Sequence, residues 1–229
     1  MDYASRTSAV EKVVNDMRKR DSLLTLRGWR DEVYTIAASY NSPPLFAMER
    51  AATSAFGVRV YGAHVNGYVV DENDNYFLWI GQRSKTKQTF PGMYDNLAAG
   101  GIGNGLSPTE TMRKECEEEA GIPENLLKNL KSVGAVSYCY EDENGVHWEG
   151  EFIYDLKLPK SFIPKAADNE MERFQLLSIS KVKELVIADN FKPNCALITL
   201  DFLMRHGFIT PDQEPDYFFI LENMHKSGL

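Results

Sequence analysis

The sequence has few cysteines and no long apolar run. Its three cysteines, Cys116, Cys139 and Cys195, are widely spaced and form no C-x-x-C pair. This pattern excludes a disulfide-stapled scaffold and the common zinc-binding spacings. No apolar run approaches the roughly 18 residues that cross a bilayer, and the opening MDYASRTSAV has no signal-peptide core. These absences predict a reduced, cytoplasmic protein with no membrane partner.

Positive charge is also scarce. The 229 residues contain 25 Lys and Arg against 33 Asp and Glu, which gives a net charge of -8. This balance argues against nucleic acid as the main partner, because a nucleic-acid surface needs a basic patch. The length is sufficient for a substantial hydrophobic core, and no internal repeat or low-complexity tract is present.

The chain does contain a glycine-rich segment that leads into a run rich in glutamate, AGGIGNGLSPTETMRKECEEEAGI from Ala99 to Ile122. Ser107, Pro108 and Glu110 predict the start of a helix, because serine caps free amides, proline suits the first helical position, and Glu110 completes a capping box. Gly121 predicts the end of this helix.

Three glutamates share one face of the predicted helix. Glu115, Glu118 and Glu119 stand at positions i, i+3 and i+4. Like charges at this spacing repel one another, and a hard divalent cation among the oxygens relieves the repulsion. The pattern therefore favours a Mg²⁺ site, with Mn²⁺ as the alternative. A solvated acidic face is the competing interpretation for glutamates alone.

The glycines before the helix favour the metal site over a solvated face. They let the backbone approach a phosphate or offer a carbonyl oxygen to a metal. These glycines are Gly100, Gly101, Gly103 and Gly105.

Loop and helix together resemble the Nudix box, usually written G-x5-E-x7-R-E-U-x-E-E-x-G-U, where U is a bulky apolar residue. The matching residues are Gly100, Glu115, Cys116, Glu118, Glu119, Gly121 and Ile122. Two positions depart from the pattern: Leu106 replaces the first glutamate, and Lys114 replaces the arginine. Lysine can orient a neighbouring glutamate as a point charge, but it lacks the forked geometry of arginine. Leu106 removes the fourth box carboxylate.

The other elements are read from periodicity and turn signals. Predicted helices cover 8–20, 46–56, 124–130, 181–188, 193–206 and 217–226, and predicted strands cover 29–38, 61–70, 76–83, 94–99, 132–141, 146–158 and 172–179. Residues 1–57 are interpreted as an N-terminal helical and strand extension, and residues 58–229 as a Nudix domain with C-terminal helices. The fold class expected is α/β, a Nudix-type α/β/α sandwich with a mixed sheet.

Phrases outside the box narrow the resemblance. They include WRDEVY, PLFAMERAA, FGVRVYGAHVNGYV, QRSKTK, DNLAAGG, VGAVSYCYED and FKPNCALITLDFLMRHGFI. Together they resemble the Nudix hydrolases found beside, or fused to, thiamine pyrophosphokinase, a subfamily that departs from the general box at the same two positions. Members usually start with a longer N-terminal region than this sequence carries. The resemblance implies hydrolysis of oxo- and oxythiamine diphosphate to the monophosphate and phosphate.

The resemblance also implies a site. Glu115, Glu118 and Glu119, with the carbonyl of Ala99 or Gly100, hold Mg²⁺ against the diphosphate, and a water deprotonated by a glutamate attacks phosphorus in line. Lys114 orients Glu115. The base is either Glu115 or a carboxylate of the acidic loop 168–172, where Glu172 is favoured over Glu170. Arg83 and Lys85 are expected to contact phosphate, whereas His64 is interpreted as structural.

Two alternatives remain open, and a third is disfavoured. The substrate is ADP-ribose or a dinucleotide instead, or the chain is a non-catalytic Nudix module that binds a phosphorylated ligand. A Nudix-fold isomerase would need a placed cysteine and metal-binding histidines, which Cys139 and four scattered histidines do not supply. The expected partner is a small diphosphate, and a homodimer is left open because Nudix proteins frequently dimerise.

Overall fold

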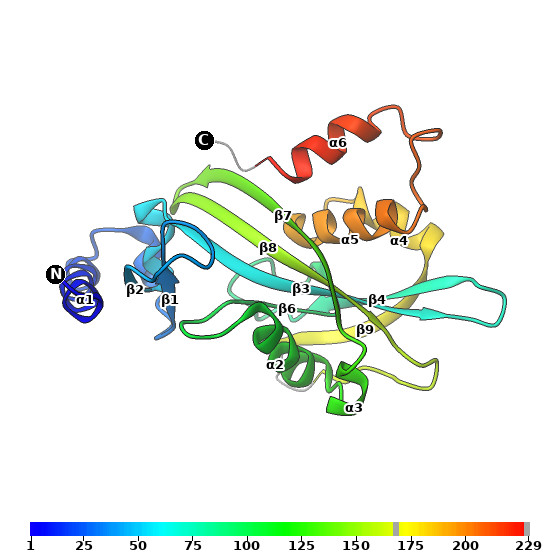
Figure 1. The fold of residues 1–229 in the computed structure, drawn as a ribbon, viewed down its shortest axis with the longest axis horizontal. Coiled ribbons are helices and arrows are strands. Elements are labelled where there is room, and N and C mark those ends of the chain that lie inside the picture. Colours follow the sequence, from blue (N-terminus) through cyan, green and yellow to red (C-terminus); the bar gives the residue numbers. More distant parts are fainter. Residues whose placement is uncertain (167–169, 227–229) are drawn as a thin grey trace.

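A mixed sheet of seven strands forms the centre of the molecule (Figure 1). The computed structural model describes residues 1–166 and 170–226. In the sheet, the strands follow the order β5-β4-β3-β8-β7, with β6 paired to β3 and β9 paired to β4. Only the β3–β8 pair is parallel among the described pairs. The strands are β3 Arg59–Val70, β4 Tyr76–Arg83, β5 Tyr94–Asp95, β6 Ala98–Gly101, β7 Lys131–Asp142, β8 Gly145–Lys157 and β9 Met171–Ser178.

Helices cover both sides of the sheet, which gives the predicted α/β sandwich. Figure 1 shows α2 (Pro108–Ala120) and α3 (Glu124–Leu127) on one side, with α4 (Ile179–Val186) and α5 (Pro193–Arg205) on the other. Successive side chains of a strand point to opposite faces. Ala63 and Val65 of β3 therefore pack in the α2 core, whereas Tyr68 packs in the α5 core.

The box helix forms where the sequence predicts it. The Ser107 hydroxyl accepts a hydrogen bond from the Glu110 amide, and the Glu110 carboxylate accepts one from the Ser107 amide, which completes the capping box. Gly121 ends the helix with φ 62°, a conformation that favours glycine. Local capping chemistry therefore suffices to set both ends of this helix.

The first helix begins earlier than predicted. Helix α1 spans Tyr3–Lys19, and the Asp2 side chain caps it by accepting from the Ser5 amide. Ser8 lies inside the helix, because Asp2 provides the N-terminal cap first. Val14 is buried as expected, but Val13 remains 49% exposed, so the apolar face is narrower than the sequence pattern indicates.

The helix predicted for residues 46–56 is wrong. Phe46–Glu49 forms strand β2, which pairs with β1 (Val33–Ile36) in a small separate sheet. Two short 3₁₀ turns follow, and Gly57 ends the second with φ 58°. Pairing with β1 buries Ala47 and Met48. A non-local hydrogen-bonding partner therefore overrode a weak local preference.

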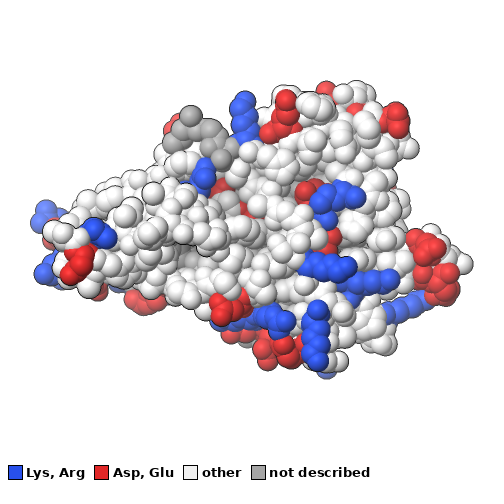
Figure 2. All heavy atoms as spheres, in the orientation of Figure 1, with Lys and Arg blue, Asp and Glu red and all other residues white. Residues whose placement is uncertain are grey.

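The remaining elements agree with expectation within a few residues. The predicted strand over 94–99 divides into β5 and β6, which pair with β4 and β3 respectively. β7 and β8 form the predicted hairpin, and α6 (Tyr217–Met224) is the last described helix. None of the helices in the described ranges combines the length and apolarity needed to span a bilayer. Figure 2 shows acidic and basic side chains intermixed on one face of the molecule.

Candidate functional site

Helix α2 brings two of the box glutamates against the glycine-rich segment. The Glu119 side chain is almost completely buried, and its Oε2 accepts a hydrogen bond of 2.9 Å from the Ala99 amide. The Glu115 carboxyl packs on Gly100, where a Cβ atom would lie 2.5 Å from Glu115 Cδ. Glycine at position 100 therefore allows the carboxylate to reach the backbone of β6.

Burial and mutual repulsion act on both carboxylates. Burial raises the pKa of Glu115, with the charges of Glu118 and Glu170 adding to it against Lys114. Burial also raises the pKa of Glu119 well above its usual value, and Asp95, Glu115 and Glu170 act in the same direction. When these carboxyls are ionised, they outnumber the neighbouring cations Lys114 and Lys87, so the ionised cluster suits an added cation.

Lys114 lies beside the two outer carboxylates. Its Nζ atom is 3.7 Å from Glu115 Oε1 and 3.3 Å from Glu118 Oε2. Glu118 is about half exposed, with 53% of its side chain accessible. This geometry agrees with an orienting role for Lys114 toward Glu115, exerted as a point charge.

The donor chemistry of the cluster fits a hard divalent cation. Within the part of the chain that the structure describes, no three His, Cys, Asp or Glu side chains converge as a ready-made metal site. Even so, the partly buried Glu115 carboxyl packs on Gly100, and the buried Glu119 carboxyl is bound by the neighbouring Ala99 amide. The residues that would hold such a cation are Glu115, Glu118 and Glu119.

The structure places Glu170, rather than Glu172, beside the box. The Glu170 and Glu119 side chains are hydrogen-bonded, and Glu170 forms an ion pair with Lys87. Although burial acts in the opposite direction, Lys87 lowers the pKa of Glu170. Glu172 is exposed and occupies the β-bulge opposite Gln82 and Arg83. Asp168, in the same predicted acidic loop, lies outside the described residues.

Arg83 has a structural role that the sequence did not indicate. It is buried, its Nη1 donates to Asp95 Oδ2 at 2.7 Å, and its other nitrogens donate to the carbonyls of Thr89 and Phe90. These contacts hold the loop after β4 and do not favour the predicted phosphate contact. Lys85 is exposed on the same loop, and its phosphate contact stays a prediction.

A second polar cluster lies between the sheet and α5. His64 Nδ1 is 2.9 Å from Asn96 Oδ1, and its Nε2 is 3.6 Å from Glu151 Oε2. Cys195 of α5 donates from its thiol to Asp95 Oδ1 at 2.7 Å. His64 thus has buried partners on both ring nitrogens, which fits the structural role predicted for it.

Three residues of this second cluster, Tyr138, Glu149 and Glu151, were not identified from the sequence. The Tyr138 hydroxyl is 2.6 Å from Glu149 Oε2 and 2.9 Å from Glu151 Oε1. Burial and the Glu151 charge raise the pKa of Glu149 to about 7. Against the effect of burial, His64 lowers the pKa of Glu151 to about 2. The alternation of the β7–β8 hairpin offers no signal that distinguishes these glutamates from solvated ones.

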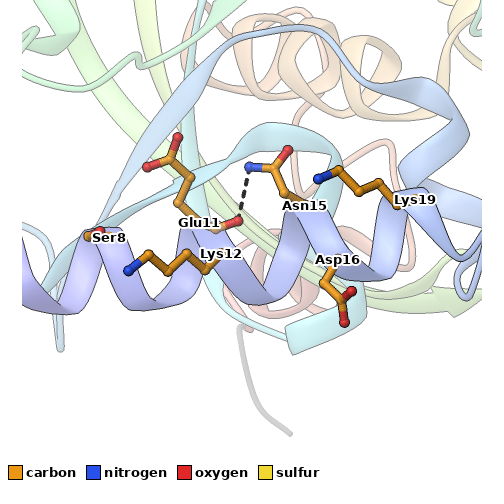
Figure 3. Close-up of a pocket in the computed structure, with 6 residues that line it drawn as sticks. All are labelled: Ser8, Glu11, Lys12, Asn15, Asp16 and Lys19. Atoms are coloured by element: carbon orange, nitrogen blue, oxygen red, sulfur yellow. Dashed lines mark hydrogen bonds between the residues drawn. The ribbon is translucent and has the colours of Figure 1, made fainter.

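Two surface hollows lie away from the box. One runs along α1 and is lined by polar side chains of both charges, as Figure 3 shows, with Asn15 donating to the Glu11 carbonyl at 3.0 Å. The other lies between α4, α5 and the segment before α6, and its lining is largely apolar. None of the predicted site residues lines either hollow.

Comparison with protein families matches both parts of the chain. Residues 60–195 match the model of the NUDIX domain. Residues 1–60 match a model described as a domain of unknown function, DUF4743. The NUDIX match covers more than half of the chain and includes the whole glycine-rich segment and α2.

Curated relatives extend over nearly the whole chain. Nudix hydrolase 20, chloroplastic, of Arabidopsis thaliana is 43% identical over 90% of this chain and 54% of its own length. Nudix hydrolase 24, chloroplastic, of the same plant is 42% identical over 96% of this chain and 60% of its own length. The uncharacterized protein YJR142W of Saccharomyces cerevisiae is 38% identical over 98% of this chain and 69% of its own length.

The chain thus spans between about half and two thirds of the length of these relatives. Its carboxylate-rich helix, its mixed sheet and the family match lead to one assignment. The chain belongs to the Nudix family of hydrolases.

Proposed function

We propose that the chain hydrolyses a diphosphate linkage in a reaction that depends on a divalent cation. The observation that carries this proposal is the contact of the Glu115 carboxyl with Gly100, beside the buried Glu119. A buried cluster with excess negative charge is costly unless a cation joins it. The cluster opens to the surface at Glu118, where a charged substrate can approach.

Bound Mg²⁺ would neutralise charge on the diphosphate oxygens and favour attack of water at phosphorus. The residues of the chain then have separable tasks. Glu119 is held in place by the Ala99 amide, and Lys114 restrains Glu115 and Glu118. We assign the proton from water to Glu115, because a raised pKa makes a carboxylate a better base near neutral pH. Glu170 remains the second candidate.

The proposed substrates are analogues of thiamine diphosphate, above all the oxo and oxy forms, with the monophosphate and phosphate as products. Support comes from the sequence phrases shared with the thiamine-associated subfamily, which extend well outside the box. A cytoplasmic location and a homodimer belong to the same proposal. The names of the two plant relatives assign those proteins to the chloroplast.

Product analysis tests this proposal. The protein is incubated with Mg²⁺ and oxothiamine diphosphate, thiamine diphosphate or ADP-ribose, and phosphate, monophosphate and AMP are quantified. Glu119→Gln should lower kcat about 100-fold or more, since it removes charge from the proposed cation site. Glu117→Gln is the matched control, because Glu117 is exposed on the same helix, and its kcat should stay within about twofold.

The other outcomes identify the alternatives. AMP as the main product would replace the thiamine-type substrate by a nucleoside-linked one. Thermal stabilisation by Mg²⁺ without turnover of any of the three compounds would indicate a non-catalytic binding module. Equal turnover by Glu119→Gln and the unmodified chain would refute a role for the cluster in the reaction.

A further inference from the structure

The glycine-rich loop of the box is attached to the N-terminal segment, residues 1–60, whose family model has no assigned function. The Asn104 amide donates to the Val33 carbonyl at 3.0 Å. The Asn104 side-chain oxygen accepts from the Thr35 hydroxyl at 2.7 Å and from the Tyr3 hydroxyl at 3.2 Å. Helix α1 and strand β1 therefore converge on a single loop residue.

A second contact between the N-terminal segment and the loop lies three residues earlier, at Gly101. The Tyr34 phenol packs directly against this glycine, so that a Cβ atom at position 101 would overlap the phenol oxygen. Tyr34 is only 5% exposed, and the Arg50 guanidinium lies over its ring at 5.5 Å. Arg50 in turn pairs with Glu32 at 2.9 Å. Tyr34, which contacts the loop, is thus held by packing within the N-terminal segment.

The electrostatic field of the same segment reaches the box. The Glu32 charge is among the causes that raise the pKa values of Glu115 and Lys114. The charge of Glu32, just before β1, therefore acts on the same side chains as the charges of α2, in addition to the backbone contacts.

The loop has few internal restraints. Leu106 occupies the position of the first box glutamate, is 43% exposed, and has no polar side-chain atom to bond with the loop. Its amide donates to the Gly103 carbonyl at 3.1 Å, and the Ile102 amide donates to the Tyr61 carbonyl at 2.8 Å. Between these two points, the contacts at Asn104 come from the N-terminal segment.

We propose that the N-terminal segment positions the glycine-rich loop of the Nudix box, with Thr35, Tyr34 and the Val33 carbonyl as its positioning groups. The segment thereby supplies restraint that the box lacks at Leu106. A loop held in one conformation lowers the ordering cost of binding a cation and a diphosphate beside it. The consequence for catalysis rests on the proposed function, whereas the restraint itself does not.

The test measures loop order directly. Amide hydrogen exchange over residues 101–106 is followed in the full chain without added metal, and Mg²⁺ affinity is measured by titration calorimetry. Thr35→Val removes the hydroxyl and keeps the shape. Exchange at Asn104 should accelerate about 3- to 10-fold, the range for one lost hydrogen bond, and Mg²⁺ should bind more weakly by a similar factor. Thr35→Ser, which restores the hydroxyl, should recover both values.

Thr25→Val is the matched control. Thr25 lies in the same segment, and its hydroxyl donates to the Ala51 carbonyl at 2.6 Å without touching the loop. The Thr25→Val substitution should lower the melting temperature of the chain while leaving the exchange rate of the Asn104 amide within about twofold. If Thr35→Val leaves exchange unchanged, or if Thr25→Val accelerates it equally, the positioning role is wrong. Accelerated exchange in a chain that hydrolyses none of the diphosphates would retain the positioning role and reject the proposed function alone.

Discussion

Two clusters of charged side chains lie on opposite sides of the sheet, and they differ in how their charge is compensated. In the cluster against α5, Asp95 pairs with Arg83, and Glu151 lies near His64. In the cluster on α2, the charges of Glu115 and Glu170 help to raise the pKa of Glu119, although Glu170 is also hydrogen-bonded to Glu119. The first cluster is called closed because Asp95 and Glu151 each lie beside a cationic side chain, although Glu151 also raises the pKa of its neighbour Glu149. The second has more carboxylates than cations, and this difference supports the proposal that it binds a cation and a diphosphate.

Breaking the closed cluster should have the largest effect. Arg83→Met removes the ion-pair partner of the buried Asp95, which keeps only the charge of Lys192 nearby. Removal of one partner of a buried pair costs about 3–5 kcal/mol of unfolding free energy. Urea denaturation measures this loss. Lys181→Met is the control, because the Lys181–Glu184 pair is more than half exposed and should change the unfolding free energy by no more than about 0.5 kcal/mol. Equal losses in both variants would contradict the distinction between the clusters.

The role of the cluster on α2 can be tested by comparing two nearby acidic residues, Glu170 and Glu172. Glu170 is hydrogen-bonded to Glu119, so Glu170→Gln should lower kcat about 10- to 100-fold. Glu172 is exposed in the bulge of β9, so Glu172→Gln should stay within about twofold. Steady-state kinetics with Mg²⁺ held at saturation measures both. A larger loss for Glu172→Gln would restore the interpretation made from the sequence.

The smallest expected effect concerns pH. The pKa of the Glu119 carboxyl is raised in the folded chain, first by burial. Folding therefore favours its protonated form, and the metal-free chain should lose stability as pH rises above the ordinary carboxyl range toward the raised pKa. Glu119→Gln removes this titration while keeping an acceptor for the Ala99 amide. Between pH 4 and 8, the melting temperature should depend less on pH in this variant than in the unmodified chain. An equal or steeper dependence would contradict a raised pKa of Glu119.

The comparison also shows which parts of the site the sequence can reveal. Glu115, Glu118 and Glu119 lie within one helix, and their spacing already implies a common face. Glu170 and Lys87 reach the box only because β9 pairs with β4. Arg83 looked available for a phosphate, since a sequence does not show that Asp95 and two loop carbonyls surround it.

The box helix, its two ends and the α/β class can all be predicted from the amino-acid sequence. Capping, glycine conformation and hydrophobic periodicity act over a few neighbouring residues, and those forces can be read in order along the chain. Three features emerge only in the folded chain: residues 46–49 form a strand, Glu170 lies beside the box, and Thr35 contacts Asn104. These outcomes depend on partners distant in sequence, whose contacts exist only after the sheet has assembled.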